Sequence, residues 1–421
     1  MKVIHILFLL LLASLGCQTP TPKEQPKKAV FIILDGIPAD VLERVATPTL
    51  DEIAAAGGYT RAYVGGDVGQ YNQTPTISAP GYMDLLTATW ANKHNVWDNY
   101  NQSPNYHYWN LFRIAKNAAP ALPTAIFSTW LDNRTVLIGD GKPEAGGRLI
   151  DYAADGYELD TLRFPHDTAA TYILNIDELV AETAGKYIAE QAPGLSWVYL
   201  EHTDDVGHAL GDGTLMDEAV KRADAQVKKI WDAVKVRQQK GEDWMIVVTT
   251  DHGRDAVKGM DHGGQTDRER TTWIVTNAKN LNERFGKEPL PITDIAPSIL
   301  KHLGMAPPEA IAFEMDGVPF VGAVSVADLR VKRAGDRLQL SWKVFDEAGD
   351  AEVQCAFTNY YKTGGEDVYE KMGHFPVKDG AATIPLNAAQ WAAFEKSGII
   401  KIVLKAPGNV VNRWLVENSP E

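Results

Sequence analysis

Three continuous apolar runs in this chain each end close to an aspartate. The runs are Ala29–Leu34, Trp197–Leu200 and Trp244–Val248, and the aspartates that follow them are Asp35, Asp204 and Asp251. Such runs are typical of strands buried on both faces of a parallel sheet. Because ligands bind at the carboxyl ends of such strands, the three carboxylates are predicted to converge on one sheet edge. Converging Asp and His residues indicate a cluster of divalent metals.

Composition limits the classes of partner. The chain has 421 residues, enough for two or three domains, and 45% of them are hydrophobic, so a large core is possible. The formal net charge is −14. A protein that binds nucleic-acid polymers nonspecifically needs a basic surface, so no such partner is expected. A small anionic substrate is still compatible with this charge, because a bound metal can dominate the local field.

The N-terminus has the pattern of an export signal. Lys2 precedes the apolar stretch Val3–Leu15, which is too short for a comfortable membrane span. Residues 1–17 end in Cys17 and resemble a bacterial lipoprotein signal, in which this cysteine is lipidated; an ordinary cleaved signal peptide is the alternative. Residues 18–28, rich in Pro, Thr and Lys, are predicted to be a flexible tether. We therefore expect an exported protein, anchored to a membrane through lipid on Cys17, in the periplasm or at the surface of a bacterium.

If Cys17 carries lipid, Cys355 is the only thiol left, and no internal disulfide can form. Stability must then come from the hydrophobic core.

Residues 29–322 alternate strand and helix patterns, which predicts a parallel α/β sheet. Two more strands are predicted at Pro123–Phe127 and Thr272–Thr276, and helices at Thr47–Ala56, Asp177–Gln191 and Leu215–Gln239. In the last helix, eight apolar residues at three-to-four spacing predict one core-facing stripe: Leu215, Ala219, Val220, Ala223, Val227, Ile230, Trp231 and Val234. Residues 100–176 are less regular and are interpreted as insertions and loops above the sheet.

Residues 323–421 have a different pattern of apolar and polar residues. Short alternating runs separated by turns occur at 338–342, 353–357, 382–386, 400–404 and 411–416. This pattern predicts a small antiparallel, immunoglobulin-like β-sandwich. It contains no Asp and His constellation, so a packing or spacer module is predicted, with carbohydrate binding as the alternative.

The candidate ligands lie close to the ends of the apolar runs. Asp251 and His252 follow a strand directly, and Gly253 lets the chain turn away. Asp204 and His208 form a second carboxylate–imidazole pair, and His262 offers a further imidazole. Spacing alone leaves Asp205 and His202 open as alternative ligands, although His202 is interpreted as structural.

Ser78 is the candidate nucleophile. It precedes the helical run Met83–Thr87, so its hydroxyl would lie at the positive end of a helix dipole, beside free backbone N–H groups. These groups stabilise an attacking alkoxide and an incoming anion. The alternative is that Ser78 is only a helix N-cap.

Together these segments resemble the alkaline phosphatase superfamily, closest to its type I phosphodiesterase/nucleotide pyrophosphatase branch. The resemblance covers roughly residues 28–320 and rests on Leu34–Gly36, Thr76–Pro80, Asp204–His208, Asp251–Gly253 and His262–Gly264. It implies an alkaline-phosphatase-like α/β sandwich around a mostly parallel sheet, here followed by the small C-terminal β-sandwich.

The resemblance also implies two zinc ions. One would be held by Asp35, Ser78, Asp251 and His252, and the other by Asp204, His208 and His262. The branch carries an asparagine that helps to hold the phosphoryl group, and Asn99 matches its position, with Asn92 and Asn95 as nearby alternatives. The implied function is a two-zinc hydrolase of small phosphate esters that acts through a phosphoseryl intermediate. Whether the ester is a monoester, a diester or a nucleotide pyrophosphate is left open.

Two departures keep other functions open. Pyrophosphatase relatives usually carry threonine where this chain has Ser78. The segment from Ser78 also resembles the sulfatase signature, but Tyr82 stands where that signature has arginine. Imidazole ligands favour zinc, whereas sulfatases bind calcium through carboxylates. The alternatives are therefore a sulfatase-like sulfuric ester hydrolase and a non-catalytic, lipid-anchored glycan-binding protein.

Overall fold

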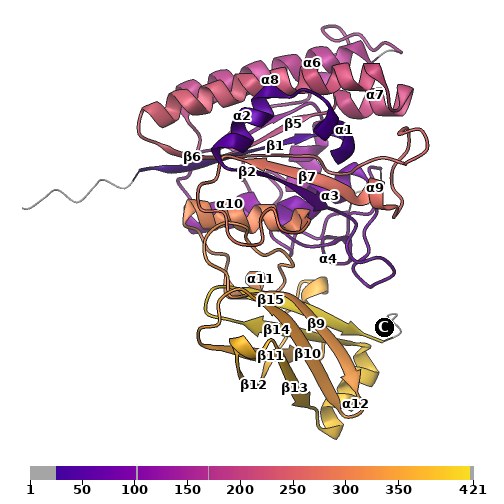
Figure 1. The fold of residues 1–421 in the computed structure, drawn as a ribbon, viewed down its shortest axis with the longest axis vertical. Coiled ribbons are helices and arrows are strands. Elements are labelled where there is room, and N and C mark those ends of the chain that lie inside the picture. Colours follow the sequence, from indigo (N-terminus) through magenta and orange to yellow (C-terminus); the bar gives the residue numbers. More distant parts are fainter. Residues whose placement is uncertain (1–24, 101–102, 169, 418–421) are drawn as a thin grey trace, which may run out of the picture.

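The computed structural model describes residues 25–100, 103–168 and 170–417 (Figure 1). Within these ranges the first part of the chain forms an eight-stranded sheet. Its strands are β1 (Lys27–Leu34), β2 (Gly58–Tyr63), β3 (Thr124–Ser128), β4 (Tyr152–Ala154), β5 (Leu195–Leu200), β6 (Asp243–Thr249), β7 (Thr271–Thr276) and β8 (Leu290–Pro291). Their order is β4-β3-β5-β1-β6-β7-β2-β8. Strand β7 runs antiparallel to both of its neighbours, and the other neighbouring strands are parallel, which confirms a mostly parallel sheet.

The three apolar runs form the three adjacent strands at the centre of the sheet. Strand β1 lies between β5 and β6, and Ile33 of β1 is in register with Tyr199 of β5 and Thr249 of β6. The three strands therefore end at the same edge, and the predicted convergence of the aspartates on that edge is confirmed.

Helices cover both faces of the sheet. They are α1 (Ala39–Arg44), α2 (Pro48–Ala56), α3 (Ser78–Thr87), α4 (Ala91–His94), α5 (Leu111–Ala118), α6 (Thr171–Gln191), α7 (His202–Leu210), α8 (Thr214–Gln239), α9 (Asp267–Arg270), α10 (Ile295–Leu303) and α11 (Glu309–Ala312). Figure 1 shows α6 and α8 on one side and α3 and α10 on the other. Alternate residues of β1 belong to two separate cores: Val30 and Ile32 pack with α6 and α8, whereas Phe31 and Ile33 pack with α3, α5 and α10.

Two expectations for this part were wrong in detail. Leu215, in the first turn of α8, is 59% exposed, whereas the seven later residues of the predicted stripe are buried. The segment 100–176 is also more regular than expected, since it holds α5, β4 and the start of α6. Helix α5 buries Leu111, Phe112, Ile114 and Ala115 on one face, a pattern too short to stand out among the neighbouring Tyr, Trp and Asn residues.

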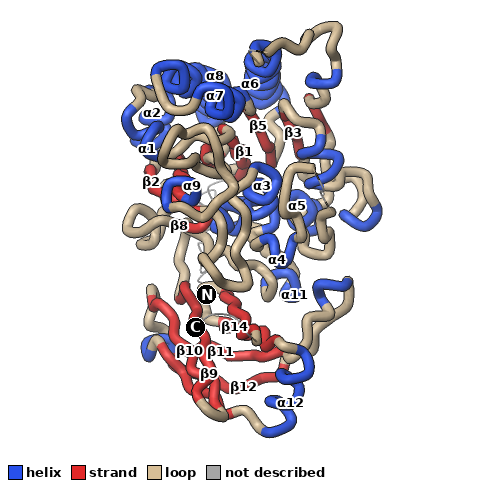
Figure 2. The backbone as a smooth tube through the Cα atoms, turned by 90° about the vertical axis from the view of Figure 1, so that its right-hand side faces the viewer, coloured by secondary structure: helices blue, strands red, loops and turns tan. Residues whose placement is uncertain are grey.

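The C-terminal part consists of two antiparallel sheets (Figure 2). Their elements are β9 (Val326–Ala334), β10 (Arg337–Val344), β11 (Asp350–Ala356), β12 (Glu370–Pro376), β13 (Ala381–Pro385), β14 (Ile399–Lys405), β15 (Val410–Val416) and the helix α12 (Ala388–Ser397). In the described residues the sheets have the orders β13-β10-β9 and β12-β11-β14-β15, and one core joins them, with Leu338 and Leu340 packed among Val353 and Ile400. The five predicted strands are present, but β9, β12 and α12 were not predicted. The domain boundary at residue 323 stays a prediction.

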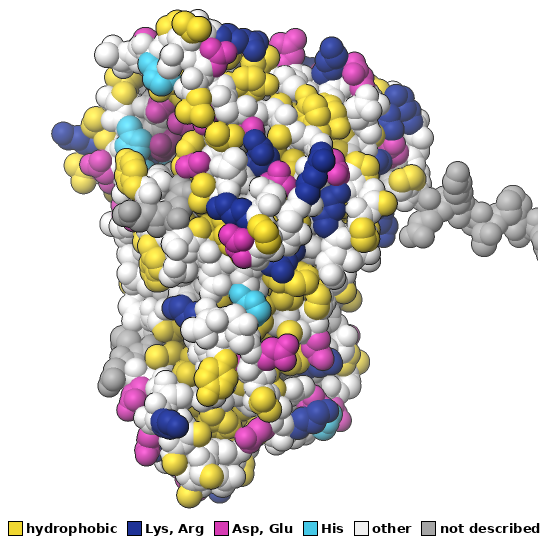
Figure 3. Space-filling model, turned by 180° about the vertical axis from the view of Figure 1, so that it is seen from behind, with side chains coloured by type: hydrophobic (Ala, Val, Ile, Leu, Met, Phe, Trp, Pro, Cys, Tyr) yellow, Lys and Arg dark blue, Asp and Glu magenta, His cyan; other side chains and the backbone are white. Residues whose placement is uncertain are grey.

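Cys17 and residues 18–24 of the predicted tether lie outside the described residues. Across residues 25–100, 103–168 and 170–417, none of the helices combines the length and the apolar character that a membrane crossing requires. On the face shown in Figure 3, acidic and basic side chains are interspersed rather than gathered by sign.

Candidate metal centre

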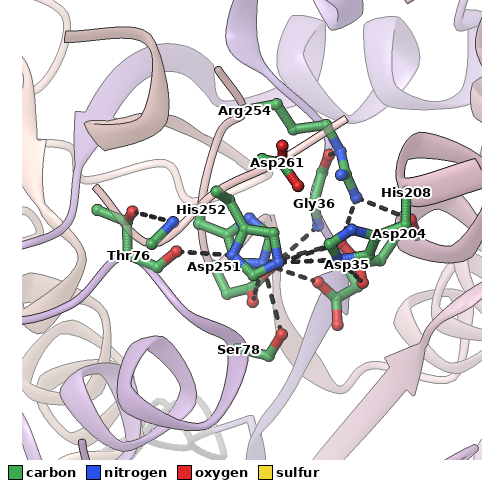
Figure 4. Close-up of polar contacts among 12 residues, drawn as sticks. Asp35, Gly36, Thr76, Ser78, Asp204, His208, Asp251, His252, Arg254 and Asp261 are labelled. Carbon is green, nitrogen blue, oxygen red and sulfur yellow. Dashed lines mark hydrogen bonds and ion pairs between the residues drawn. The ribbon is translucent and has the colours of Figure 1, made fainter. Parts of the chain in front are cut away.

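Two clusters of side chains that could hold a metal ion lie at the carboxyl edge of the central strands. Among the described residues, one cluster consists of Asp35, Asp251 and His252, and the other of Asp204, His208 and His262. In each cluster the ligand atoms lie within 4.8 Å of one another. Figure 4 shows side chains from both clusters pointing toward one another beside Ser78. The fold thus brings the predicted ligands together in the predicted partition, and their role as ligands stays a prediction.

The first cluster is buried and short of hydrogen-bond donors. Asp35 Oδ2 accepts hydrogen bonds from the hydroxyls of Tyr82 and Tyr199. In contrast, Asp35 Oδ1 and Asp251 Oδ2 are buried and have no hydrogen-bond donor in the described part of the chain. They lie 3.4 and 3.3 Å from His252 Nε2. Burial, followed by the charge of Asp204, raises the pKa of Asp251 to about 7, and burial with the charges of Asp251 and Asp204 raises that of Asp35. A cation between Asp35 Oδ1 and Asp251 Oδ2 would be a partner for both oxygens and would favour the charged form of both carboxyl groups.

Hydrogen bonds to backbone carbonyls set the tautomers of two histidines. His252 Nδ1 lies 2.9 Å from the carbonyl oxygen of Gly253, and His262 Nδ1 lies 2.9 Å from that of Thr76. A carbonyl oxygen can only accept, so each Nδ1 carries the proton and each Nε2 presents a lone pair to the site. Burial lowers the pKa of both imidazoles, which keeps them neutral and able to bind a metal.

Two members of the second cluster, Asp204 and His208, lie on one face of α7, and the third, His262, comes from the loop between β6 and α9. Asp204 and His208 are one turn apart, with His208 Nε2 at 3.3 Å from Asp204 Oδ2 and 3.0 Å from His262 Nε2. The hydrogen bond to Asp204 raises the pKa of His208. Burial favours protonation of Asp204, but the hydrogen bond from His208 and the charge of Arg254 outweigh it and hold its pKa well below the ordinary value. One carboxylate and two imidazoles are a donor set that suits zinc.

Ser78 is the first residue of α3, and Ile77 is the N-cap, so the alternative that Ser78 is only an N-cap is wrong. Ser78 Oγ lies 3.4 Å from His252 Nε2, and the side chain is almost fully buried. A Cβ at Gly81 would lie 2.8 Å from the carbonyl oxygen of Asp251, so glycine there lets α3 pack closely against the metal edge. The close contact fixes the distance between the serine hydroxyl and the first cluster.

Asn99 lies beside the candidate nucleophile. Its Oδ1 accepts a hydrogen bond of 2.9 Å from the backbone N–H of Ala79, the residue after Ser78. Of the two alternatives, Asn95 donates to the carbonyl of Ser103, and Asn92 is buried. The geometry therefore places Asn99 next to the candidate nucleophile, and its role in holding a phosphoryl group stays a prediction.

Arg254 is a residue of the site that the sequence analysis missed. Its guanidinium is fully buried, binds the carboxylate of Asp204, and donates to the carbonyl oxygens of Gly36, Asp204 and Met260. A Cβ at Gly207 would lie 2.1 Å from Arg254 Cζ, so glycine makes room for the guanidinium. The position directly after Asp251–Gly253 was the available signal, but a lone arginine on a loop is normally solvated.

The structure places the two alternative ligands, Asp205 and His202, outside both clusters. Asp205 belongs to neither cluster, and burial raises its pKa to about 6. His202 is also outside both clusters, and its backbone N–H donates to Asp177 at the start of α7, which agrees with a structural role.

Comparison with known proteins assigns the chain to a family. The family model described as type I phosphodiesterase / nucleotide pyrophosphatase matches residues 29–319. The chain belongs to this family. The ectonucleotide pyrophosphatase/phosphodiesterase family member 7 of Rattus norvegicus is 22% identical over 251 residues, which are 56% of this chain and 52% of the relative. The chain therefore spans about half the length of the curated relatives it matches.

Two solved structures are more distantly similar. Murine ectonucleotide pyrophosphatase / phosphodiesterase 5 has 13% identity and a TM-score of 0.44, covering 67% of this chain and 96% of that one. A 2-O GAG sulfatase has 13% identity and a TM-score of 0.46, covering 89% of each chain.

We expect Arg254→Ala to destabilise this family member. The change leaves the Asp204 carboxylate and three carbonyl oxygens without their buried cation, and breaking a buried ion pair costs about 3 kcal/mol. Chemical denaturation with circular dichroism measures the free energy of unfolding. Arg222→Ala, at an exposed position of α8, is the control and should change that energy little. Equal effects of the two changes would contradict the role given to Arg254.

We expect His262→Ala to lower the amount of zinc bound after purification and dialysis. The change removes one of three side chains of the second cluster and leaves the first cluster intact. Elemental analysis of the protein measures the zinc-to-protein ratio. His374→Ala, on the exposed β12, is the matched control. An unchanged ratio in His262→Ala would remove this residue from the ligand set.

Proposed function

We propose that this protein is a two-zinc hydrolase of phosphoric esters that acts through a phosphoseryl intermediate. The observation that carries the proposal is the position of Ser78 Oγ, 3.4 Å from His252 Nε2 at the N-terminus of α3, beside two clusters of ligands. Membership of the type I phosphodiesterase / nucleotide pyrophosphatase family supports the reaction class.

The donor sets fit zinc. Asp35, Ser78, Asp251 and His252 would hold one ion, and Asp204, His208 and His262 the other. Bound zinc would supply positive charge that lowers the pKa of the serine hydroxyl and neutralises the phosphoryl oxygens. The two buried carboxylate oxygens without donors, on Asp35 and Asp251, support a cation in the first cluster.

The side chains of the protein position the reacting groups. Ser78 Oγ forms a bond to phosphorus while the bond to the leaving oxygen breaks, and the amide group of Asn99 orients the phosphoryl group beside the N-terminus of α3. Water then displaces Ser78 from phosphorus and releases the product. Two in-line inversions give net retention at phosphorus.

A panel of chromogenic esters tests the proposal. Nitrophenyl phosphate, bis-nitrophenyl phosphate, a nitrophenyl nucleotide ester and nitrophenyl sulfate are compared with zinc and with a chelator. We expect zinc-dependent turnover of at least one phosphate ester, and the preferred one identifies the substrate class. Turnover of the sulfate alone, surviving chelation, would overturn the proposal in favour of the sulfatase alternative.

One observation counts against that alternative. Tyr82, which stands where the sulfatase signature has arginine, donates its hydroxyl hydrogen bond to the candidate ligand Asp35. Its side chain is fully buried in this contact, so Tyr82 has a structural role at the candidate metal centre in place of the arginine of the sulfatase signature.

We also propose that the protein is exported and anchored through lipid on Cys17, in the periplasm or at the cell surface. The support is the N-terminal pattern of Lys2, the apolar stretch Val3–Leu15 and Cys17. Metabolic labelling with a fatty acid should mark the wild-type protein and fail to mark Cys17→Ser. Equal labelling of both would exclude lipidation at this cysteine.

A further inference from the structure

The C-terminal sheets contact the segment that carries Asn99 through a buried ionic layer. Residues 314–316 lie in this layer, and Glu314 forms an ion pair with Lys401 of β14, with 2.6 Å between Glu314 Oε1 and Lys401 Nζ. Lys401 also pairs with Asp367 at 2.8 Å, and both partners are buried. Asn412 of β15 donates to the carbonyl of Met315 at 2.6 Å. The C-terminal sheets are therefore joined to the catalytic part by directional polar contacts.

Lys93 is at the centre of this layer. Its side chain is 0% exposed, and its ammonium group contacts the carbonyl oxygen of Glu314 at 2.7 Å, Asp316 Oδ1 at 2.6 Å and Asn412 Oδ1 at 3.0 Å. These three acceptors match the three donors of an ammonium group. One of them comes from the C-terminal sheets, so without Asn412 a buried N–H would lose its partner, which is costly.

From Lys93 the chain runs directly to Asn99. His94 is fully buried, and its Nε2 lies 2.9 Å from Asp84 Oδ1 on α3, while its Nδ1 accepts from the N–H of Val96 at 3.1 Å. Asn95 then turns the chain with a φ of 63°. Five residues separate Lys93 from Asn99, whose Oδ1 accepts from Ala79 next to the nucleophile. A displacement of Lys93 would therefore reach Asn99 over a short path, whose first three residues, 94–96, are held by these contacts.

The other end of the Asn99 segment is held from the same side. Asn105 donates its backbone N–H to the carbonyl of His94 at 2.8 Å and its side-chain amide to the carbonyl of Lys362 at 2.8 Å. The hydroxyl of Tyr361 donates to the carbonyl of His107 at 3.0 Å. Lys93 and Asn105, on either side of Asn99 in the sequence, thus both contact the C-terminal part.

We infer that the C-terminal sheets act as a brace that positions Asn99 against the N-terminus of α3, with Lys93 and Asn412 as positioning residues. This gives the sheets a part in turnover, beyond the spacer role predicted from the sequence. The catalytic effect rests on the proposed function, whereas the geometric effect on the Ala79 hydrogen bond does not.

The first test is Asn412→Leu, which keeps the size of the side chain and removes the acceptor for Lys93. We expect kcat to fall by about 10-fold, since misplacement by a fraction of an ångström is costly to an oriented reaction. The zinc-to-protein ratio should stay unchanged. Hydrogen exchange at the Ala79 amide should accelerate, a readout that needs no substrate. Asn412→Asp keeps the acceptor for Lys93 but loses the donor to the carbonyl of Met315, so it should restore part of the kcat that Asn412→Leu loses.

The control is Asn387→Leu, which removes the N-cap of α12 within the C-terminal part, where Asn387 accepts from the N–H of Gln390 at 2.9 Å. It destabilises that part without touching the layer, so kcat and Ala79 exchange should stay at wild-type values. Equal losses of kcat in Asn387→Leu and Asn412→Leu would overturn the inference.

A double-mutant cycle with Asn99→Ala separates positioning from general damage. If Asn412 acts through Asn99, Asn412→Leu should change kcat by less than about 2-fold in the Asn99→Ala background. Independent, multiplicative losses would overturn the inference. If Asn412→Leu does not fold, Tyr361→Phe gives the same cycle at the His107 contact. If no ester is turned over, the proposed function fails, and Ala79 exchange still decides the brace.

Discussion

Replacing Ser78 with alanine is expected to reduce turnover of the preferred phosphate ester by at least about 10³-fold, because the change removes the hydroxyl that we propose attacks phosphorus. Ser78 Oγ lies 3.4 Å from His252 Nε2, and Ser78 is the first residue of α3. Initial rates measured with the best ester of the chromogenic panel test this. Asp35, Asp251 and His252 remain, so the zinc-to-protein ratio should stay close to that of the wild type.

Ser78→Thr is the matched control, because threonine keeps the hydroxyl, and it should retain measurable turnover. Acid quenching of the wild-type reaction, followed by peptide mass spectrometry, should show phosphate on the peptide that contains Ser78 and none in the Ser78→Ala protein. Full activity in Ser78→Ala, or phosphate found on another side chain, would show that Ser78 is not the nucleophile.

Removal of divalent metal is expected to abolish turnover and to destabilise the fold. Asp35, Asp204 and Asp251 converge on one edge, and burial with mutual repulsion raises the pKa of both Asp35 and Asp251. A bound cation offsets this repulsion. A ligand at 1,000 times its dissociation constant stabilises the folded state by about 4 kcal/mol. Thermal unfolding with and without chelator measures the shift, and added zinc should restore both turnover and stability.

The control for this experiment is a protein that lacks the first cluster, Asp35→Asn combined with Asp251→Asn. Its unfolding temperature should respond less to the chelator, since only the second cluster, Asp204, His208 and His262, is left to bind an ion. Undiminished turnover of phosphate esters in the chelated wild type would contradict a metal-dependent mechanism.

The sequence was informative where a long apolar run was followed closely by a residue able to bind a metal, such as aspartate. Runs such as Ala29–Leu34 are typical of buried strands, and the rule that parallel strands bind ligands at their carboxyl ends predicts that Asp35, Asp204 and Asp251 lie together. The partition of the ligands between two ions came instead from the family resemblance, and the structure groups the side chains in the same way.

The features that could not be predicted from the sequence depend on contacts between residues far apart in the chain. Lys93 and Asn412 are separated by 319 positions, and a buried lysine cannot be told from a solvated one by local pattern. Arg254 was overlooked for the same reason. Strands β9 and β12 were missed because their charged residues, among them Arg330 and Lys371, blur the apolar alternation.

The arrangement β5-β1-β6 has a consequence for how proteins of this design can diversify. Adjacent strands in any sheet are held about 4.8 Å apart by backbone hydrogen bonds. The spacing between Asp35, which follows β1, and Asp251, which follows β6, is therefore set by the main chain, and substitutions in the surrounding loops cannot easily alter it. The loops above the edge can vary in length and chemistry while the spacing within this first cluster stays constant. Changes in these loops can thus alter the preference for a leaving group while the first cluster is kept.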